Sequence, residues 1–264
     1  MDVAAIKERQ RAIWGLGDYS LMSRVLRPAA TALCDACAVS TGQEVLDVAA
    51  GDGNFALACA RAGARVVASD LSSAMVERGR ARSEAEGYAI EWVEADAEEL
   101  PFEDRRFDCV GSVFGSMIAP RPDLAARELF RVVRPGGAVG MTAWTPESFA
   151  AALFAIGRKY MPPQPGQPLV EEWGVEETVR ERFDGLADRV EVHKATLPVE
   201  AGTSDELIED LGASAGGWGA ARRALPSERF DAMVAEFTEV VRRRGGAGPV
   251  RIDNEYVVIV ASRP

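Results

Sequence analysis

The chain has 264 residues, of which 47% are hydrophobic and 27% are charged. This composition is ordinary for a folded globular protein, so it excludes a disordered, collagen-like or coiled-coil chain. The formal net charge is −11, from 30 basic and 41 acidic residues. Phosphate binding needs a cationic surface, so this charge argues against nucleic acid as the main partner.

The same sequence offers little that would fix the chain to a membrane or hold it together by disulfides. Its longest apolar run, residues 149–156, is far shorter than the roughly 20 residues that span a bilayer. Residues 1–10 are polar and do not resemble a signal peptide. Four cysteines in a chain of this length do not indicate a disulfide framework. We therefore expect a cytoplasmic protein without a membrane partner, and we leave its oligomeric state open, with a homodimer as one possibility.

In the first part of the chain, short β-branched runs alternate with amphipathic runs. Residues 1–40 predict two helices with a break at residues 15–18. The strands predicted after them are residues 45–48, 65–69, 90–93, 107–113 and 138–143, and the helices between these strands are residues 54–62, 72–86 and 123–133. This alternation is typical of parallel strands joined by crossover helices.

The second part predicts two more helices, residues 148–160 and 175–183, and two alternating strands, residues 190–199 and 251–261. Between those strands, residues 201–248 are mostly helical and too long for a hairpin loop, so we expect a cap. We treat residues 1–264 as one domain. It would comprise N-terminal helices (1–40), a cofactor-binding core (41–145) and a substrate-side half (146–264).

A glycine turn joins the first predicted strand to the next helix. Gly51 and Gly53 would let a ligand approach the backbone, and the helix that follows offers free N–H groups to a carboxylate or phosphate. The spacing Gly51-x-Gly53-x-x-Ala56 also fits the dinucleotide-binding fingerprint. An NAD-dependent oxidoreductase and a tight turn without any ligand therefore both remain open.

Three successive predicted strands end at or near an acid: Asp47, Asp70 and Asp96. Since parallel strand ends meet at one edge of a sheet, these side chains are expected in one crevice. Asp70 lies 19 residues after Gly51, where a carboxylate can accept both ribose hydroxyls of an adenosine. An NAD site would use Gly51, Gly53 and Asp70 but would give no role to Asp96.

Together with the turn at residues 134–137, these motifs make residues 44–145 similar to the class I methyltransferases that use S-adenosylmethionine. The resemblance is to the methyltransferase type 11 group, which includes ubiquinone and menaquinone biosynthesis enzymes. It implies an α/β fold with a Rossmann-like seven-stranded sheet, whose antiparallel last strand is inserted beside the fifth. The helical N-terminal segment and helical cap insertions would flank this sheet.

The resemblance also implies a cofactor site. In it, Asp70 would hold the ribose, Asp96 and Ala97 would read the adenine, and the Tyr19 hydroxyl would reach the methionine carboxylate. Ala49 stands where the family usually has glycine and should narrow the space. An alternative for Tyr19 is a core anchor for the N-terminal helices. The expected S-adenosylmethionine site comprises Tyr19, Asp47, Ala49, Gly51, Gly53, Asn54, Asp70, Leu71, Met75, Asp96, Ala97, Phe114 and Met117.

For the methyl acceptor, the resemblance points to aromatic residues in loops over the crevice: Trp14, Trp144 and Trp218. Such a wall suits a small, largely apolar or aromatic metabolite, methylated on oxygen or carbon. The catalytic base stays unknown. His193, the only histidine, is a candidate. The alternative is that His193 is an exposed residue on a strand without a catalytic role. No metal is expected, because one histidine and an isolated Cys34-x-x-Cys37 do not supply a ligand set.

Two further expectations concern function and movement. A protein that binds S-adenosylmethionine without transferring methyl is a second alternative to the methyltransferase, because no base is obvious. Residues 1–20 and 201–248 lie outside the strand–helix rhythm, and we expect them to close together over the crevice and exclude water.

Overall fold

The computed structural model describes residues 1–16, 18–214, 216–246 and 248–264. Gly17, part of the predicted helix break at residues 15–18, lies outside this set. In the described ranges a single seven-stranded sheet has the order β3-β2-β1-β4-β5-β7-β6. Its strands are β1 (Glu44–Val48), β2 (Arg65–Asp70), β3 (Ile90–Glu94), β4 (Phe107–Val113), β5 (Val133–Trp144), β6 (Arg189–Ala201) and β7 (Val250–Ser262).

The pairing confirms the predicted topology. Strands β1 to β5 are mutually parallel, and β7 runs antiparallel between β5 and β6. The strand predicted at residues 138–143 begins earlier, at Val133, but its register against β4 jumps: Phe107 pairs with Val133 and Cys109 with Ala138. The intervening Pro135-Gly136-Gly137 therefore bulges out, with Gly136 at φ +73°. The turn expected there is present as an irregularity within β5.

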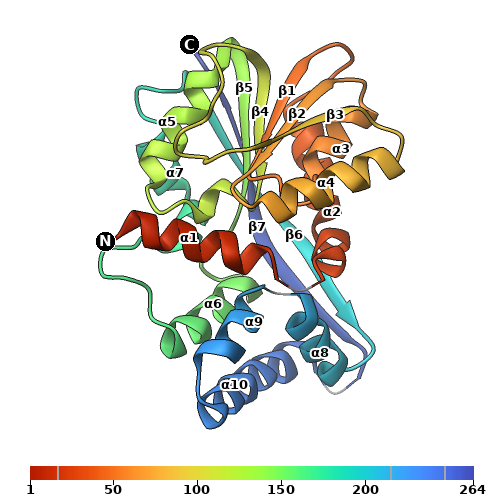
Figure 1. The fold of residues 1–264 in the computed structure, drawn as a ribbon, viewed down its shortest axis with the longest axis vertical. Coiled ribbons are helices and arrows are strands. Elements are labelled where there is room, and N and C mark those ends of the chain that lie inside the picture. Colours follow the sequence, from red (N-terminus) through yellow and green to blue (C-terminus); the bar gives the residue numbers. More distant parts are fainter. Residues whose placement is uncertain (17, 215, 247) are drawn as a thin grey trace.

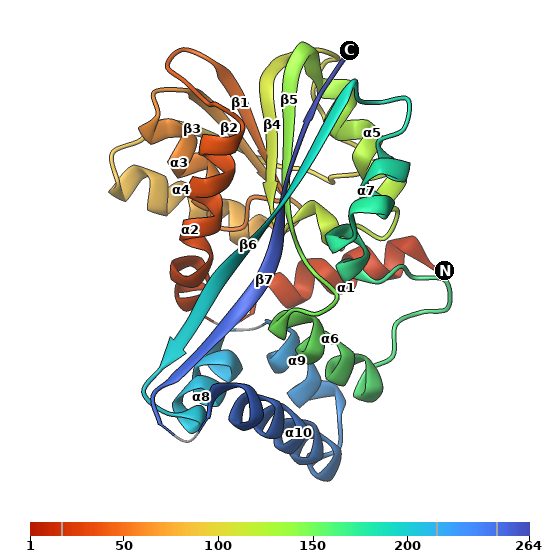
Figure 2. The same cartoon turned by 180° about the vertical axis from the view of Figure 1, so that it is seen from behind.

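Helices cover both faces of the sheet (Figures 1 and 2). The long helix α2 (Ser20–Ala36) lies on the face seen in Figure 2, and α5 (Pro122–Val132) lies on the face seen in Figure 1. The remaining helical elements are α1 (Val3–Trp14), α3 (Asn54–Arg61), α4 (Ser73–Ala85), η1 (Ser116–Ile118), α6 (Phe149–Tyr160), η2 (Val170–Gly174), α7 (Glu176–Arg182), α8 (Ser204–Ser214), α9 (Gly216–Ala224) and α10 (Ser227–Gly245).

Local sequence explains where several of these helices begin. The Asp2 carboxylate accepts a hydrogen bond from the Ala5 backbone N–H at 3.0 Å and caps α1. Ser148 caps α6 in the same way through Ala151. Pro122 occupies the first turn of α5, where its missing N–H costs nothing. In the described residues, no helix is long and apolar enough to cross a membrane.

The cap is built around the far end of the β6–β7 ribbon. These two strands extend beyond the rest of the sheet and reach α8 and α10 (Figure 2). The cap has two apolar clusters that are separate from the main core. One includes Phe149 and Val241, and the other includes Met233 and Phe237. Helix α1 lies between the sheet and the cap (Figure 1), where it contacts α9.

The N-terminal segment therefore touches the cap, as its expected joint closure requires. The Asp18 backbone N–H donates to the Ala213 carbonyl at 3.2 Å. A Cβ on Gly216 would meet the Ile13 carbonyl at 2.3 Å, so the backbones of α1 and α9 approach closely. Movement of the two segments together stays a prediction.

Candidate functional site

The turn after β1 brings the backbone close to the edge of the sheet. Ala49, Gly51 and Gly53 all have positive φ, at +53°, +57° and +91°. A Cβ on Gly51 would come within 3.3 Å of the Tyr19 ring, so a side chain there would crowd it. Ala49 adopts a left-handed conformation that costs a residue with a Cβ about 1–2 kcal/mol. Glycine would adopt this φ at position 49 without that cost.

Asp70 ends β2 and lies against this turn. Its carboxylate accepts hydrogen bonds from the backbone N–H groups of Gly51 and Ser72, both at 2.9 Å. Burial raises the pKa of Asp70 to about 6, although these hydrogen bonds act in the opposite direction. The buried carboxylate also lines a cavity, where further donors from a ligand would stabilise its charged form.

Asp96 follows β3 and meets a residue that sequence reasoning missed. One of its oxygens accepts from the Glu98 backbone N–H at 2.9 Å, and the other pairs with Lys7 Nζ at 2.5 Å. Lys7 also pairs with Glu98, whose side chain is fully buried and which binds Arg121 Nε at 2.7 Å. An ion-pair network centred on the buried Glu98 thus joins α1 to the loop after β3 and to the start of α5.

A second network braces the glycine turn from outside. Arg82 of α4 donates to Ser23 Oγ at 2.7 Å and to Asn54 Oδ1 at 3.0 Å, and it pairs with Asp52 at 3.0 Å. Ser23 Oγ in turn contacts Asp52 Oδ1 at 2.9 Å. Because α2, α3 and α4 all contribute, the turn is held by three helices.

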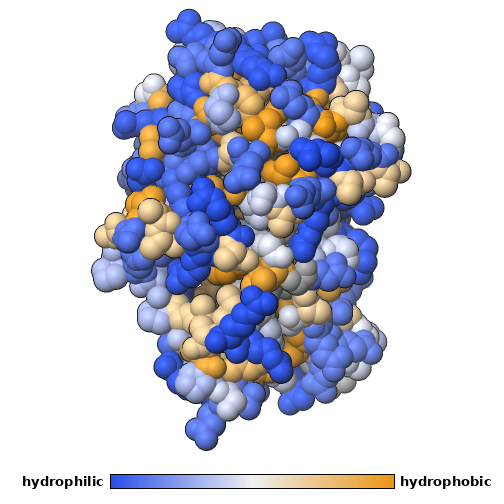
Figure 3. All heavy atoms as spheres, viewed as in Figure 1, coloured by the Kyte–Doolittle hydropathy of each residue, from blue (hydrophilic) through white to orange (hydrophobic). Residues whose placement is uncertain are grey.

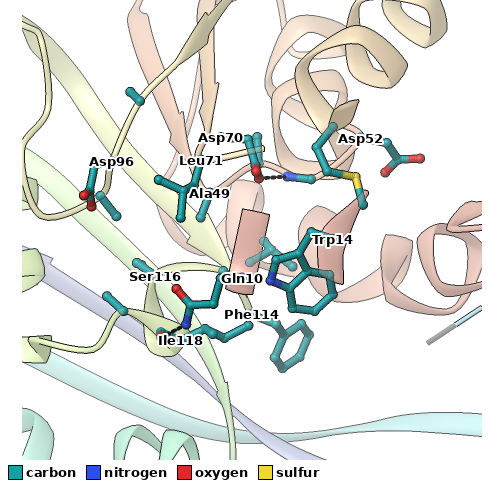
Figure 4. Close-up of a pocket in the computed structure, with 18 of the residues that line it drawn as sticks. Gln10, Trp14, Ala49, Asp52, Asp70, Leu71, Asp96, Phe114, Ser116 and Ile118 are labelled. Carbon is teal, nitrogen blue, oxygen red and sulfur yellow. Dashed lines mark hydrogen bonds between the residues drawn. The ribbon is translucent and has the colours of Figure 1, made fainter. Parts of the chain in front are cut away.

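These features surround one cavity at the carboxyl edge of the sheet, with about 890 Å³ of empty space that is partly open to solvent. Asp96 lies toward one end, Asp70 near the middle and Asp52 toward the other end (Figure 4). The wall opposite the acids is mostly apolar and includes Trp14, Phe114 and Ile118. In the space-filling view, apolar surface shows around the middle of this face, near α1 and the cap (Figure 3).

Most of the expected cofactor residues line this cavity. They are Tyr19, Ala49, Gly51, Asn54, Asp70, Leu71, Met75, Asp96, Ala97 and Phe114. Asp47, Gly53 and Met117 are not among the described lining residues. Asp47 is buried behind the turn, where its carboxylate accepts from the Ala56 N–H at 2.8 Å, and burial raises its pKa well above the usual value.

The three tryptophans expected at the acceptor are not brought together. Trp14 lines the cavity. Trp144 is buried and stacks on Phe114, with ring centroids 3.9 Å apart and planes at 12°. Trp218 stacks on Phe237 at 5.1 Å inside the cap. Trp144 therefore backs the cavity wall through Phe114, and Trp218 packs the cap core.

His193 lies apart from the cavity. It is on the edge strand β6, its side chain is 64% exposed, and its ring nitrogen lies 3.3 Å from Glu191. The four cysteines of the chain are all free and buried in the core. Among the described residues, no cluster of three or more His, Cys, Asp or Glu is arranged to hold a metal ion.

The donors and acceptors present fit S-adenosylmethionine. Asp70 offers a buried carboxylate that two ribose hydroxyls would satisfy, and Asp96 with the neighbouring Ala97 offers an acceptor and a backbone N–H for the adenine edge. Helix α3 begins directly after the glycine turn, with Gly53 as its N-cap, and a helix N-terminus suits a carboxylate such as that of the methionine end.

Comparisons with known proteins agree with this geometry. The family described as "Methyltransferase domain" matches residues 45–137. An uncharacterized Mycobacterium tuberculosis protein, Rv1405c, is 44% identical over 153 residues, which cover 58% of this chain but only 56% of that protein. A second one, Rv1403c, is 40% identical over 199 residues, covering 74% of this chain and 73% of that protein.

A relative with a named activity is the demethylmenaquinone methyltransferase of Clavibacter sepedonicus, 43% identical over 104 residues, or 39% of this chain and 42% of that enzyme. Among solved structures, Haemonchus contortus phosphoethanolamine N-methyltransferase 2, bound to phosphomonomethylethanolamine and S-adenosylhomocysteine, superposes with a TM-score of 0.60 and 19% identity, over 90% of this chain and 52% of that one. The fold, the matched family and these relatives show that the chain belongs to the class I S-adenosylmethionine-dependent methyltransferases.

Proposed function

We propose that this protein transfers the methyl group of S-adenosylmethionine to a small, largely apolar or aromatic metabolite, on an oxygen or a carbon atom. The observation that carries the proposal is the pairing, within one cavity, of two acids at strand ends with an apolar wall. Asp70 and Asp96 suit an adenosine, and Trp14, Phe114 and Ile118 offer a surface for an apolar acceptor.

When bound, S-adenosylmethionine would supply an activated methyl group. The acceptor would take this methyl group as the electron pair of the carbon–sulfur bond goes to sulfur, and the acceptor proton would leave to solvent. The protein would contribute position, since alignment of acceptor and methyl can lower the barrier by several kcal/mol. Asp70 would fix the ribose. The turn at residues 49–53 would fix the methionine end.

Tyr19 suits the role of hydrogen-bond donor at that end. Its partly buried ring lies against Gly51. Burial and the nearby carboxylates of Asp52, Asp70 and Asp47 raise its pKa, so the hydroxyl keeps its proton at neutral pH. A protonated phenol can donate to the methionine carboxylate but cannot serve as a base there.

The proposal is tested by incubating the protein with S-adenosylmethionine carrying a tritiated methyl group and a panel of phenols and quinols, then measuring label in the organic phase and S-adenosylhomocysteine in the aqueous phase. Equal amounts of both products are expected. His193→Ala is the matched control and should retain this activity, because the residue lies outside the cavity.

Two other results would contradict the proposal. Tight binding of NAD with no binding of S-adenosylhomocysteine in calorimetry would support an oxidoreductase. Binding of S-adenosylhomocysteine with no methyl transfer to any panel member would favour a protein that uses the cofactor without transfer.

A further inference from the structure

One face of α1 forms a wall of the cavity along its length. Lys7, Gln10 and Trp14 are spaced three and four residues apart, so they share this face, and all three line the cavity. Each meets a different partner. Lys7 pairs with Asp96, Gln10 Nε2 donates to the Ile118 carbonyl at 2.9 Å, and Trp14 meets the Tyr19 ring edge-on at 6.3 Å. The wall therefore offers a cation, an amide and an aromatic ring in succession.

The hydrogen bond to Ile118 fixes the orientation of the Gln10 amide. A carbonyl oxygen can only accept, so the Gln10 nitrogen must face Ile118 and the Gln10 oxygen must point elsewhere. Figure 4 shows this oxygen directed away from Ile118, toward the space bordered by Ala49, Leu71 and Ser116. No hydrogen bond from the described residues reaches it. The cavity thus contains a fixed acceptor.

Ser116 supplies a second polar group at the same wall. It lines the cavity at the start of η1, it is 1% exposed, and its Oγ has no hydrogen-bond partner among the described residues. Its backbone N–H is held by Ser112 Oγ at 2.8 Å, which keeps the residue in place. Buried hydroxyls normally have a partner, so this unpartnered hydroxyl at a cavity wall is free to donate to a bound ligand.

We propose that Gln10 and Ser116 form the subsite that recognises a hydroxyl group of the methyl acceptor. The acceptor O–H donates to Gln10 Oε1, and its oxygen accepts from Ser116 Oγ–H. The surrounding Trp14, Phe114 and Ile118 side chains contact the rest of the molecule, so the substrate class is a hydroxylated aromatic compound. This inference rests on the proposed function and narrows its acceptor.

The chemistry of the two groups distinguishes a hydroxyl from its alternatives. A hydroxyl donates one hydrogen bond and accepts another, which matches one fixed acceptor and one hydroxyl donor. An ether can only accept, so it would leave the Gln10 oxygen without a donor. A carboxylate would place its negative charge next to the Gln10 oxygen, which is itself an acceptor, and the two groups would repel each other.

The test uses a matched pair of probes, 2-naphthol and 2-methoxynaphthalene, titrated into the protein saturated with S-adenosylhomocysteine. We expect 2-naphthol to bind at least about fivefold more tightly, the effect of one hydrogen bond. Gln10→Leu should bring the two affinities within about twofold of each other, because it removes the acceptor that only 2-naphthol can use. Ser116→Ala should weaken both probes by about fivefold and keep their ratio, because both probes can accept from the Ser116 hydroxyl. In both variants the affinity for S-adenosylhomocysteine should stay within about twofold of its original value.

Arg9→Leu is the control, since Arg9 is an exposed residue of the same helix; it should keep the discrimination. Equal binding of the two probes to the original protein, or failure of both to bind, would overturn the subsite. So would unchanged discrimination in Gln10→Leu, or unchanged affinity of both probes in Ser116→Ala. Weaker S-adenosylhomocysteine binding in Gln10→Leu with discrimination retained would assign Gln10 to the cofactor instead. Failure of the original protein to bind S-adenosylhomocysteine would refute the proposed function itself and is measured first.

Discussion

The two sides of the cavity are built in different ways. The cofactor side comes from the ends of β1, β2 and β3, and its residues are fixed by contacts between neighbouring strands and turns, such as Gly51 with Asp70. The opposite side comes from α1, which reaches the cavity from the other end of the sequence through Lys7 and Gln10, 89 and 108 residues away from their partners. The first side depends on local geometry, and the second depends on how the whole chain packs.

The largest effect is expected on the α1 side. Lys7→Ala would leave the fully buried Glu98 with Arg121 alone and would leave Asp96 without its cation. Breaking a buried ion pair costs about 3–5 kcal/mol, and we expect about 3 kcal/mol because Arg121 still compensates Glu98. Urea unfolding measures this loss. Arg9→Ala on the exposed face is the control. A loss below about 1 kcal/mol, typical of a surface pair, would show that α1 is not held in this way.

On the strand side, Asp70→Ala should weaken S-adenosylhomocysteine binding. The lost hydrogen bonds from the ribose to a charged group correspond to about 1.5–3 kcal/mol, or roughly 10- to 150-fold in Kd. Calorimetry measures the change. An unchanged Kd would remove Asp70 from the cofactor site and leave its burial unexplained.

The pH dependence of cofactor binding should report on the same carboxylate. Burial raises the pKa of Asp70 to about 6 from 3.8. Between pH 3.8 and 6, Asp70 is therefore mostly protonated in the folded protein without ligand, whereas it is mostly ionised in the unfolded chain. Ribose hydroxyls donate to the ionised form. As the pH rises, cofactor binding should therefore tighten about tenfold per unit below pH 6 and level off above about pH 7.

Asp70→Asn separates this effect from the titration of Asp47, whose pKa is also raised by burial. The variant should bind weakly at every pH and lose the slope. A slope that persists in Asp70→Asn would assign the titration to another group.

Some of the residues behind these expectations could be predicted from the sequence, and others could not. The strand ends and the placing of Asp70 and Asp96 follow from hydrophobic period and spacing, whereas the order of the sheet was implied by the resemblance to the methyltransferases. The structure brings both acids to one cavity. Lys7 was missed because a lysine on an amphipathic helix ordinarily faces solvent, and only its distant partners make it buried. Its spacing of three residues from Gln10 and seven from Trp14, which places all three on one helix face, was the available signal.

Two of the tryptophans that we expected at the acceptor site show the opposite error. Trp144 and Trp218 stand in segments next to the crevice, yet each stacks on a neighbouring ring, Phe114 or Phe237. The sequence position of a tryptophan does not distinguish a residue that lines a ligand site from one that packs in the core. Only packing decides between these roles.

The smallest effect concerns the glycine turn. Ala49→Gly should stabilise the protein by about 0.5–1 kcal/mol, because the left-handed φ of +53° strains an alanine and this gain exceeds the entropy that glycine adds to the unfolded chain. Thermal unfolding measures it. Gly115→Ala is the opposing control: a Cβ there would meet the Ala49 carbonyl at 2.3 Å, so this variant should lose stability. A destabilised Ala49→Gly would show that the turn is not strained.

The most direct test of the account is a crystal structure of the protein with S-adenosylhomocysteine. We predict the ribose hydroxyls on Asp70, the adenine edge at Asp96 and Ala97, and the α1 face of Lys7, Gln10 and Trp14 closed over the ligand. An adenosine bound outside the space between Asp70 and Asp96, or α1 displaced from the cavity in the complex, would contradict it.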